Sequence, residues 1–244
     1  MAIAEFRKLR HDNADVFTRS VQPLLWLFVF GTALQNVRRL GVEGDYRAYL
    51  VPGVMAQAAL FISIFFGLAV IWERDAGQLQ RLLATPLPRL AIVFGKSSGA
   101  AVRALVQAVL LLAVVAVARI PLTWSVGGVL GALVLLVLGT AGFASMSMLL
   151  AAFVKTRERF LGIGQLVVMP LFFASSALYP LSILPFWLRV VARANPLTYE
   201  VHGLRNLLLG IGGGDPLWLD FAVCLAWFAV LAVAAARMYP RAIL

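Results

Sequence analysis

Gly95-Lys96-Ser97 is the stretch of the sequence that comes closest to a phosphate-binding site. A P-loop binds nucleotide phosphates through the pattern G-x-x-x-x-G-K-[ST], placed between a strand and a helix. Here Leu90 stands where the first glycine is required, and a long apolar run follows Ser97. We therefore interpret Lys96 as an anchor at a membrane surface and predict that this chain does not bind ATP itself.

The residues that hold metals or perform nucleophilic catalysis are scarce in this sequence. It contains one cysteine, Cys224, within an apolar run, and two histidines, His11 and His202, far apart in the chain. A metal site needs several such ligands. Paired carboxylates, a Cys/His cluster and a nucleophile elbow are also missing from the sequence. We therefore predict no catalytic residue and no metal site, and we do not expect an enzyme.

The composition indicates a membrane protein. Hydrophobic residues make up 62% of the chain, charged residues make up 13%, and the mean hydropathy is +0.91. A soluble domain averages about 45–50% apolar and about 25% charged residues. The net charge of +10 would suit nucleic-acid binding in a soluble protein. No basic run with interleaved aromatic residues occurs, so we expect the basic loops to contact membrane lipid, with no nucleic-acid partner.

Six apolar runs approach the roughly 20 residues that a membrane-spanning helix needs. They cover residues 16–37, 50–72, 95–118, 126–154, 160–179 and 217–236. Polar residues interrupt the first run, and Pro170 is expected to kink the fifth. The sequence thus predicts an all-α integral membrane protein with six transmembrane helices in a single domain, 1–244. Residues 1–20 fit a helix lying in the membrane interface, with a charged tail as the alternative.

The basic residues indicate how the spans are oriented. With the N-terminus inside, thirteen basic residues lie on the inner side, seven on the outer side and Arg103 within a span, which accounts for all 21. Cytoplasmic loops carry an excess of Lys and Arg. This distribution predicts that both termini are cytoplasmic. Arg103 lies near the start of its span and is expected to extend its side chain towards the inner surface.

The segment 73–89 between the second and third spans has a helical pattern although it is too polar to enter lipid. Its apolar side consists of Leu79, Leu82, Leu83 and Leu87, with charged and amide residues mostly on the other side. Prolines at 86 and 88 end the pattern. We predict a stiff helical element at the cytoplasmic surface that contacts a soluble partner. The alternative is an amphipathic helix that only rests on lipid.

The segment 180–216 also contains a helical pattern. Asn195 can cap a helix that has Pro196 at its first position, and Gly210 is suited to end it. The apolar positions are Leu197, Val201, Leu204 and Leu208, and we expect Glu200, Arg205 and Asn206 to point elsewhere. This predicts a short amphipathic helix at the outer face, which could re-enter the membrane where protein or water shields it.

Three stretches resemble the ABC-2 type permeases, the membrane subunits of ATP-driven exporters. Residues 73–89, ERDAGQLQRLLATPLPR, resemble the cytoplasmic signature of these permeases, although Gln78 and Gln80 stand where the family often has Thr and Glu. Residues 195–210, NPLTYEVHGLRNLLLG, are similar to the second signature. Residues 21–31, VQPLLWLFVFG, resemble the first-span entry of the daunorubicin-resistance-like branch. Nodulation lipo-oligosaccharide exporters are close relatives of that branch.

The resemblance implies a bacterial inner-membrane complex of two six-helix permease subunits, identical or paralogous, with two copies of a separate ABC ATPase subunit. ATP and Mg would bind to the ATPase partner, and this chain would bind no cofactor. The implied ATPase-docking residues are Glu73, Arg74, Gly77, Leu79, Leu82, Leu83, Thr85, Pro86 and Arg89. The implied external gate residues are Asn195, Pro196, Leu197, Tyr199, Val201, Leu204, Arg205 and Leu208.

A substrate path at the dimer interface would be lined by apolar and amide side chains. The candidate path residues are Gln57, Phe61, Phe65, Gln165, Phe172 and Phe173. They indicate a hydrophobic or amphipathic substrate such as a drug, a lipid or a lipid-linked oligosaccharide. The alternative function is an ion-coupled carrier or channel, which usually needs ionisable groups inside the membrane. We expect all eleven acidic residues in loops or near span ends, with Glu73 and Asp220 closest to the apolar runs, which favours an external energy source.

Overall fold

The computed structural model describes residues 21–33, 45–78, 87–154, 156–211 and 215–238, and all regular elements in these ranges are helices. This confirms the predicted all-α fold. The helix Val21–Ala33 contains η1 (Trp26–Phe30) and ends in α3 (Gly31–Ala33). The helices that follow are α4 (Tyr46–Asp75), α6 (Arg89–Val117), α7 (Val126–Phe153), α8 (Arg157–Phe173), η3 (Leu181–Ile183), α9 (Phe186–Ala194), α10 (Pro196–Leu209) and α11 (Leu217–Met238).

Four helices are long and apolar enough to cross a membrane, namely α4, α6, α7 and α11. They correspond to the second, third, fourth and sixth predicted spans, although α4 and α6 each begin several residues earlier than predicted. The helix Val21–Ala33 is apolar but shorter, and it lies within the first predicted span. The predicted interfacial helix, 1–20, lies outside the described residues.

The predicted end of the fifth span at Tyr179 is wrong, because α8 has 17 residues and ends at Phe173. The side-chain amide of Asn195 donates to the carbonyl oxygens of Leu171 and Ala174, at 2.6 and 2.9 Å. The Ser175 hydroxyl then forms hydrogen bonds with backbone groups close to it in sequence, and the helix does not continue. A helix end leaves carbonyl groups that need such partners, so the distant Asn195 makes this early end possible.

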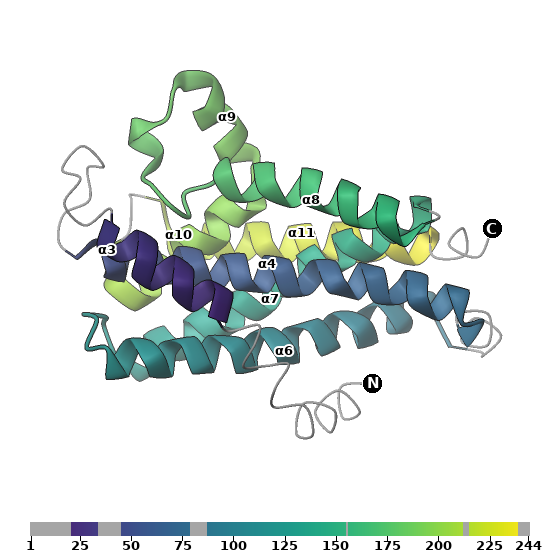
Figure 1. The fold of residues 1–244 in the computed structure, drawn as a ribbon, viewed down its shortest axis with the longest axis horizontal. Coiled ribbons are helices and arrows are strands. Elements are labelled where there is room, and N and C mark those ends of the chain that lie inside the picture. Colours follow the sequence, from purple (N-terminus) through teal and green to yellow (C-terminus); the bar gives the residue numbers. More distant parts are fainter. Residues whose placement is uncertain (1–20, 34–44, 79–86, 155, 212–214, 239–244) are drawn as a thin grey trace.

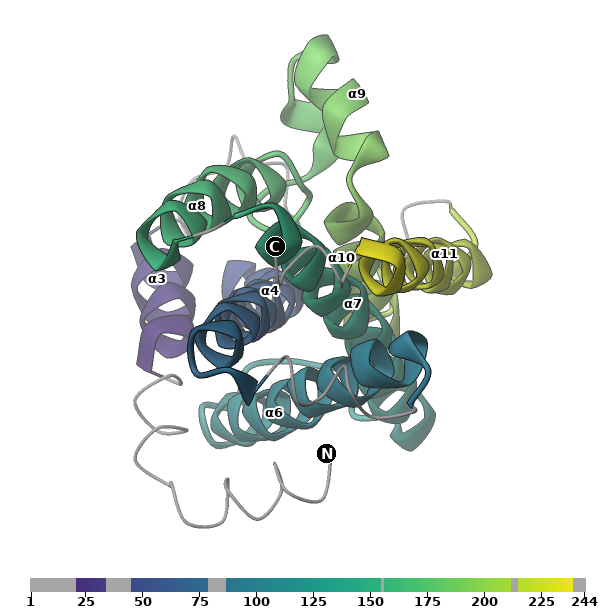
Figure 2. The same cartoon turned by 90° about the vertical axis from the view of Figure 1, so that its right-hand side faces the viewer.

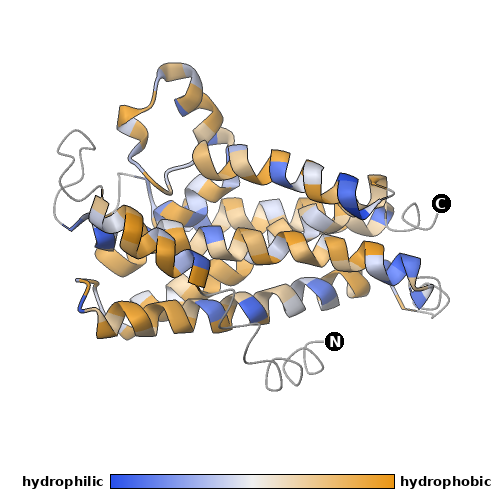
Figure 3. Ribbon diagram, viewed as in Figure 1, coloured by the Kyte–Doolittle hydropathy of each residue, from blue (hydrophilic) through white to orange (hydrophobic). Residues whose placement is uncertain are grey.

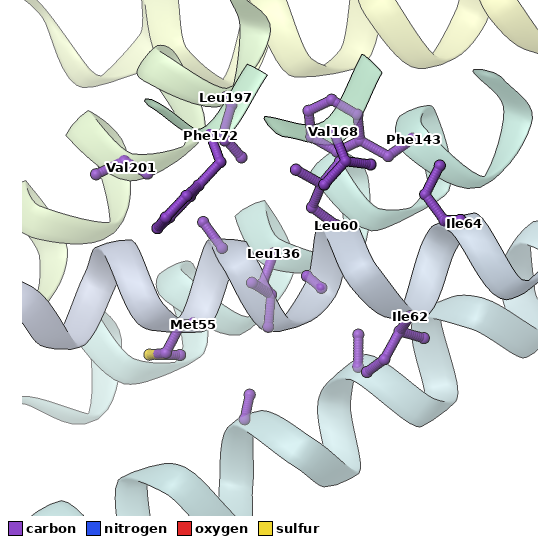
Figure 4. Close-up of a cluster of buried hydrophobic side chains, with 14 of the residues drawn as sticks. Met55, Leu60, Ile62, Ile64, Leu136, Phe143, Val168, Phe172, Leu197 and Val201 are labelled. Carbon is purple, nitrogen blue, oxygen red and sulfur yellow. The ribbon is translucent and has the colours of Figure 1, made fainter. Parts of the chain in front are cut away.

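The helices form a bundle in which α4 and α7 lie in the middle (Figures 1 and 2). Around them lie Val21–Ala33, α6, α8 and α11, while α9 projects from the bundle. The core between the helices is apolar and includes Leu60, Leu136, Phe143 and Phe172 (Figure 4). Gly53 is packed directly against the backbone of Ala177, so that any larger residue there would overlap it.

The helix α10 lies inside the bundle, packed against α7, α11 and α4. Leu197, Val201, Leu204 and Leu208 are fully buried, as their spacing predicts. However, the prediction that the charged residues of this helix point away from the apolar side is wrong, because Glu200 and Arg205 are buried as well. The exposed amphipathic helix is the neighbouring α9, in which Phe186, Trp187, Val190 and Val191 are all exposed.

Hydrophilic residues gather where α4 ends, whereas the long helices are mainly hydrophobic (Figure 3). We name the group Glu73, Arg74, Asp75, Lys96 and Arg157 the charged cluster. Its contacts bring together the end of α4, the first turns of α6 and the beginning of α8. The helix α10 lies at the opposite end of the bundle (Figure 1).

Candidate functional site

The charged cluster joins α4 to its neighbours at the predicted cytoplasmic end. The Lys96 Nζ atom lies 2.6 Å from Oε1 of Glu73, and Arg157 pairs with Asp75 at 2.9 Å. Arg74 donates to the backbone carbonyl of Val154, just after α7, at 3.2 Å. The interpretation of Lys96 as a surface anchor is therefore wrong, because its side chain is only 8% exposed and is held in an ion pair.

Gly77 ends α4 in a turn that other residues adopt at a cost. Its φ of +68° is left-handed, and its N–H donates to the carbonyl of Arg74 at 2.9 Å. The predicted helix from Glu73 therefore does not begin there, because Glu73, Arg74 and Asp75 form the last turn of α4. Arg89 is exposed at the first position of α6. The remaining docking residues, Leu79, Leu82, Leu83, Thr85 and Pro86, lie outside the described residues.

The start and end of α10 are as predicted. The side-chain oxygen of Asn195 accepts a hydrogen bond from the N–H of Leu197 at 3.0 Å, and Pro196 occupies the first helical position. Gly210 ends the helix with a φ of +69°. The Tyr199 hydroxyl donates to the carbonyl of Arg193 at 2.9 Å, which links α10 to α9. These contacts fix both ends of α10, whereas its role as an external gate stays a prediction.

Arg205 joins α10 to two other parts of the chain. Its Nη2 atom donates to the carbonyl of Ser176 at 2.9 Å. Its guanidinium carbon lies 3.7 Å from the centre of the Tyr49 ring on α4, a distance suited to a cation–π contact. The hydroxyl of Tyr46, one turn earlier on α4, donates to the carbonyl of Leu178 at 2.7 Å. These contacts bind α10, the helix predicted to form the gate, to the segment after α8 and to the beginning of α4. We call α10 the gate helix.

Two fully buried acidic residues, Glu200 on α10 and Asp220 in the first turn of α11, were not predicted as buried. Oδ2 of Asp220 lies 2.8 Å from Nδ1 of His202. This hydrogen bond raises the pKa of His202, and the negative charges of Asp220 and Asp215 raise it further. The sequence held a signal for Glu200, because it stands three residues after Leu197 and four before Leu204, on the same apolar stripe.

A cavity of about 280 Å³ lies between Val21–Ala33, α4, α6 and α8. It brings together four of the predicted path residues, Gln57, Phe61, Phe65 and Gln165. The other two do not line it: Phe172 is buried against Trp26, with ring centres 5.8 Å apart, and Phe173 is exposed. Among the described residues, its lining also includes Gln22 and Gln107, which were not predicted from the sequence, and it includes no charged side chain.

This lining suits an uncharged or partly apolar molecule, since such pockets combine an apolar wall with a few polar groups. Gln57 is 3% exposed, and its Oε1 atom has no hydrogen-bond partner within the described part of the chain. A buried acceptor without a partner is costly, so a ligand that donates a hydrogen bond would be favoured there. In the described ranges, no group of three or more His, Cys, Asp or Glu residues is arranged to hold a metal.

The long apolar helices are those of a multi-pass membrane protein, and the cavity between them is lined by apolar and amide side chains. The sequence model of the family described as ABC-2 type transporter matches residues 1–209. The chain therefore belongs to the ABC-2 type transporter family. The 244 residues hold a permease subunit, with no ATPase domain among them.

Three relatives show the range of this similarity. The chain is 31% identical to the transport permease ycf38 of Cyanophora paradoxa, over 83% of this chain and 70% of the relative. It is 30% identical to nodulation protein J of Rhizobium leguminosarum bv. trifolii, over 81% of this chain and 75% of the relative. It is 26% identical to the daunorubicin resistance permease DrrB1 of Streptomyces coeruleorubidus, over 94% and 81% of the two chains.

Proposed function

We propose that this chain exports a hydrophobic or amphipathic substrate, such as a drug, a lipid or a lipid-linked oligosaccharide, by alternating access between two permease subunits. The observation that carries this proposal is the uncharged cavity between four helices, which contains Gln57, Phe61, Phe65 and Gln165. In this proposal, Val21–Ala33 and α8 complete a set of six spans with the four long helices. The substrate leaves the cytoplasm or the inner leaflet.

The cavity is suited to a site completed by a second permease subunit. Phe65 and Gln165 line it and are also exposed, so it opens at the surface of this subunit. Exposed apolar residues on α8, including Leu161 and Leu166, extend that surface. A second subunit, identical or paralogous, would enclose a larger substrate between the two cavities. Alternating access then needs two conformations of this dimer, each favoured by different contacts.

Energy enters through an ATPase partner, as membership in the family implies. We place its docking site at the segment 73–89, with two ATPase copies carrying the ATP and Mg. The charged cluster supports this assignment, because it ties the beginning of that segment to α6, α7 and α8 through Glu73, Arg74 and Asp75. A force applied there would reach several helices at once. This end faces the cytoplasm of a bacterial inner membrane, with both termini inside.

Co-purification with the ATPase encoded beside the permease tests the proposal. We expect a complex with two copies of each subunit in mild detergent. Leu83→Glu should detach the ATPase, because it places a charge on the apolar side of the docking segment. The matched control is Gln78→Glu, which adds the same charge on the opposite side and should leave the complex intact. Equal ATPase binding by both variants would show that the docking site lies elsewhere.

The ion-coupled carrier is a second candidate, because Glu200 and Asp220 are buried acidic residues of the kind that such carriers use. Substrate transport in liposomes distinguishes the ATP-driven exporter from the ion-coupled carrier. Transport that requires ATP and the ATPase subunit supports the exporter. Transport by the permease alone, driven by a pH gradient, would favour the carrier.

A further inference from the structure

The contact between α7, α10 and α11 contains a carboxyl group without a protein partner. Glu200 is 0% exposed, and neither of its carboxyl oxygens has a hydrogen-bond partner among the described residues. Its carboxyl lies against Gly139 in the middle of α7, where the Cβ of any larger residue would overlap it. Gly139 therefore makes the space in which this carboxyl sits.

Within the part of the chain that the structure describes, the groups around Glu200 offer it no positive charge. The helix α7 contains no titratable side chain. From α11, Asp220 and Cys224 face this region, and the Cys224 thiol is within electrostatic reach of both buried carboxyls. Arg205, on the same helix as Glu200, instead directs its guanidinium to the carbonyl of Ser176 and the ring of Tyr49.

Among the described residues, further titratable groups near α10 belong to α4, α9 and the chain before α11. Tyr46 bonds the carbonyl of Leu178 on the α4 side. On α9, Arg189 donates to backbone carbonyls of the preceding segment, and Arg193 is exposed. The negative charge of Asp215, before α11, raises the pKa of His202. None of these groups is in a position to neutralise an ionised Glu200.

An ionised carboxylate buried without donors is far more costly than its protonated form. We propose that Glu200 is a proton-binding site, whose carboxyl holds a proton while α10 is packed against Gly139 and releases it when α10 moves away. The ligand is thus a proton, and its occupancy reports the position of the gate helix. Movement of α10 would expose the carboxyl to water, where ionisation costs little.

A further pair of titratable residues, one of them partly exposed, lies between α10 and α11. Asp220 is fully buried and bonds His202, whose side chain is 19% exposed. Because His202 and Glu200 lie on the same helix, movement of α10 would carry both away from α11. This movement would open the contact between α10 and α11, which is where we expect the Glu200 proton to leave.

Infrared spectroscopy of the full-length protein in lipid nanodiscs tests the proposal directly. The difference spectrum between wild type and Glu200→Gln should show the C=O stretch of a protonated carboxylic acid at neutral pH. Gln has the shape of the neutral acid, so this variant should fold. The control Glu158→Gln removes an exposed acid of α8, and its difference spectrum should lack this C=O band. A carboxylate signal for Glu200 at neutral pH, with or without a bound cation, would overturn the proposal.

A second variant tests the link to the position of α10. Gly139→Ala places a methyl group in the space of the carboxyl and should displace it towards water. We expect the acid band of Glu200 to disappear at lower pH in this variant than in the wild type. An unchanged titration would refute the coupling. The readout requires neither ATPase nor substrate, so its failure is distinguishable from failure of the exporter proposal.

Discussion

At the scale of single residues, charged groups bind parts of the chain that are far apart in sequence. Lys96 reaches back to Glu73, Arg205 reaches Ser176 and the Tyr49 ring, and Asp220 accepts from His202. A buried charge is tolerated when it is paired or hydrogen-bonded. These contacts therefore determine which helices stay together at each end of the bundle.

The His202–Asp220 contact makes stability depend on pH. Because the hydrogen bond to Asp220 raises the pKa of His202, the stabilisation is complete below the ordinary histidine pKa of about 6.5 and is lost as the pH rises through the raised pKa. We expect the thermal stability of the wild type in nanodiscs to decrease over this range. His202→Gln should show a smaller decrease, since it removes this titration and leaves Glu200 unchanged. Identical pH profiles would contradict the assignment.

At the scale of elements, α10 is held at both of its ends. Asn195 caps its first turn and also satisfies the carbonyl groups at the end of α8. At the other end, the carbonyl of Leu208 accepts from the N–H of Thr123, in the connection between α6 and α7, at 2.7 Å. One short helix thus fixes two connections of the bundle, and its movement would release both.

Two substitutions at Asn195 separate its two roles. Asn195→Ala removes the cap and both donors to α8, so we expect a loss of about 2–4 kcal/mol in the free energy of unfolding. Asn195→Asp preserves the cap but cannot donate to the carbonyls of Leu171 and Ala174, and it should fold with an intermediate stability. Denaturant unfolding in detergent measures both. If the Asn195→Asp variant has the same free energy of unfolding as the wild type, the hydrogen bonds from Asn195 to the end of α8 contribute little to stability.

At the scale of the whole molecule, α4 passes all three candidate sites. Its 30 residues extend over about 45 Å at 1.5 Å per residue. Tyr49 lies under the gate helix, Gln57 and Phe61 line the cavity, and Glu73 belongs to the charged cluster. In the proposed function, α4 connects the ATPase-docking end of the bundle with the gate end.

Two glycines of α8 provide a matched test of the cavity. Gly164 lines it, whereas Gly162, half a turn earlier, has no atom within 4 Å of the position of an added Cβ. Gly164→Phe should fill the cavity and decrease transport on the order of tenfold, whereas Gly162→Phe should leave it nearly unchanged. Transport into inverted vesicles measures this, with ATPase binding as the control. Equal transport by both variants would place the substrate path elsewhere.

Local sequence was sufficient to predict the long helices, because a backbone in lipid must satisfy its hydrogen bonds internally over a run of about 20 apolar residues. It was also sufficient for the ends of α10, since Asn195, Pro196 and Gly210 act on neighbouring backbone. Gln57, Phe61, Phe65 and Gln165 line one cavity, and their role in a substrate path stays a prediction. The docking segment 79–86 lies outside what the structure describes.

Only the tertiary structure decided the environment of the charged residues. The sequence indicated that Glu200 and Arg205 point away from the apolar side of an amphipathic helix, but both are buried, because α10 is enclosed by α4, α7 and α11. The sequence indicated that Lys96 is a surface anchor, but in the folded structure its side chain pairs with Glu73. Helix periodicity reports which residues share a face, whereas burial of that face depends on helices that are distant in sequence.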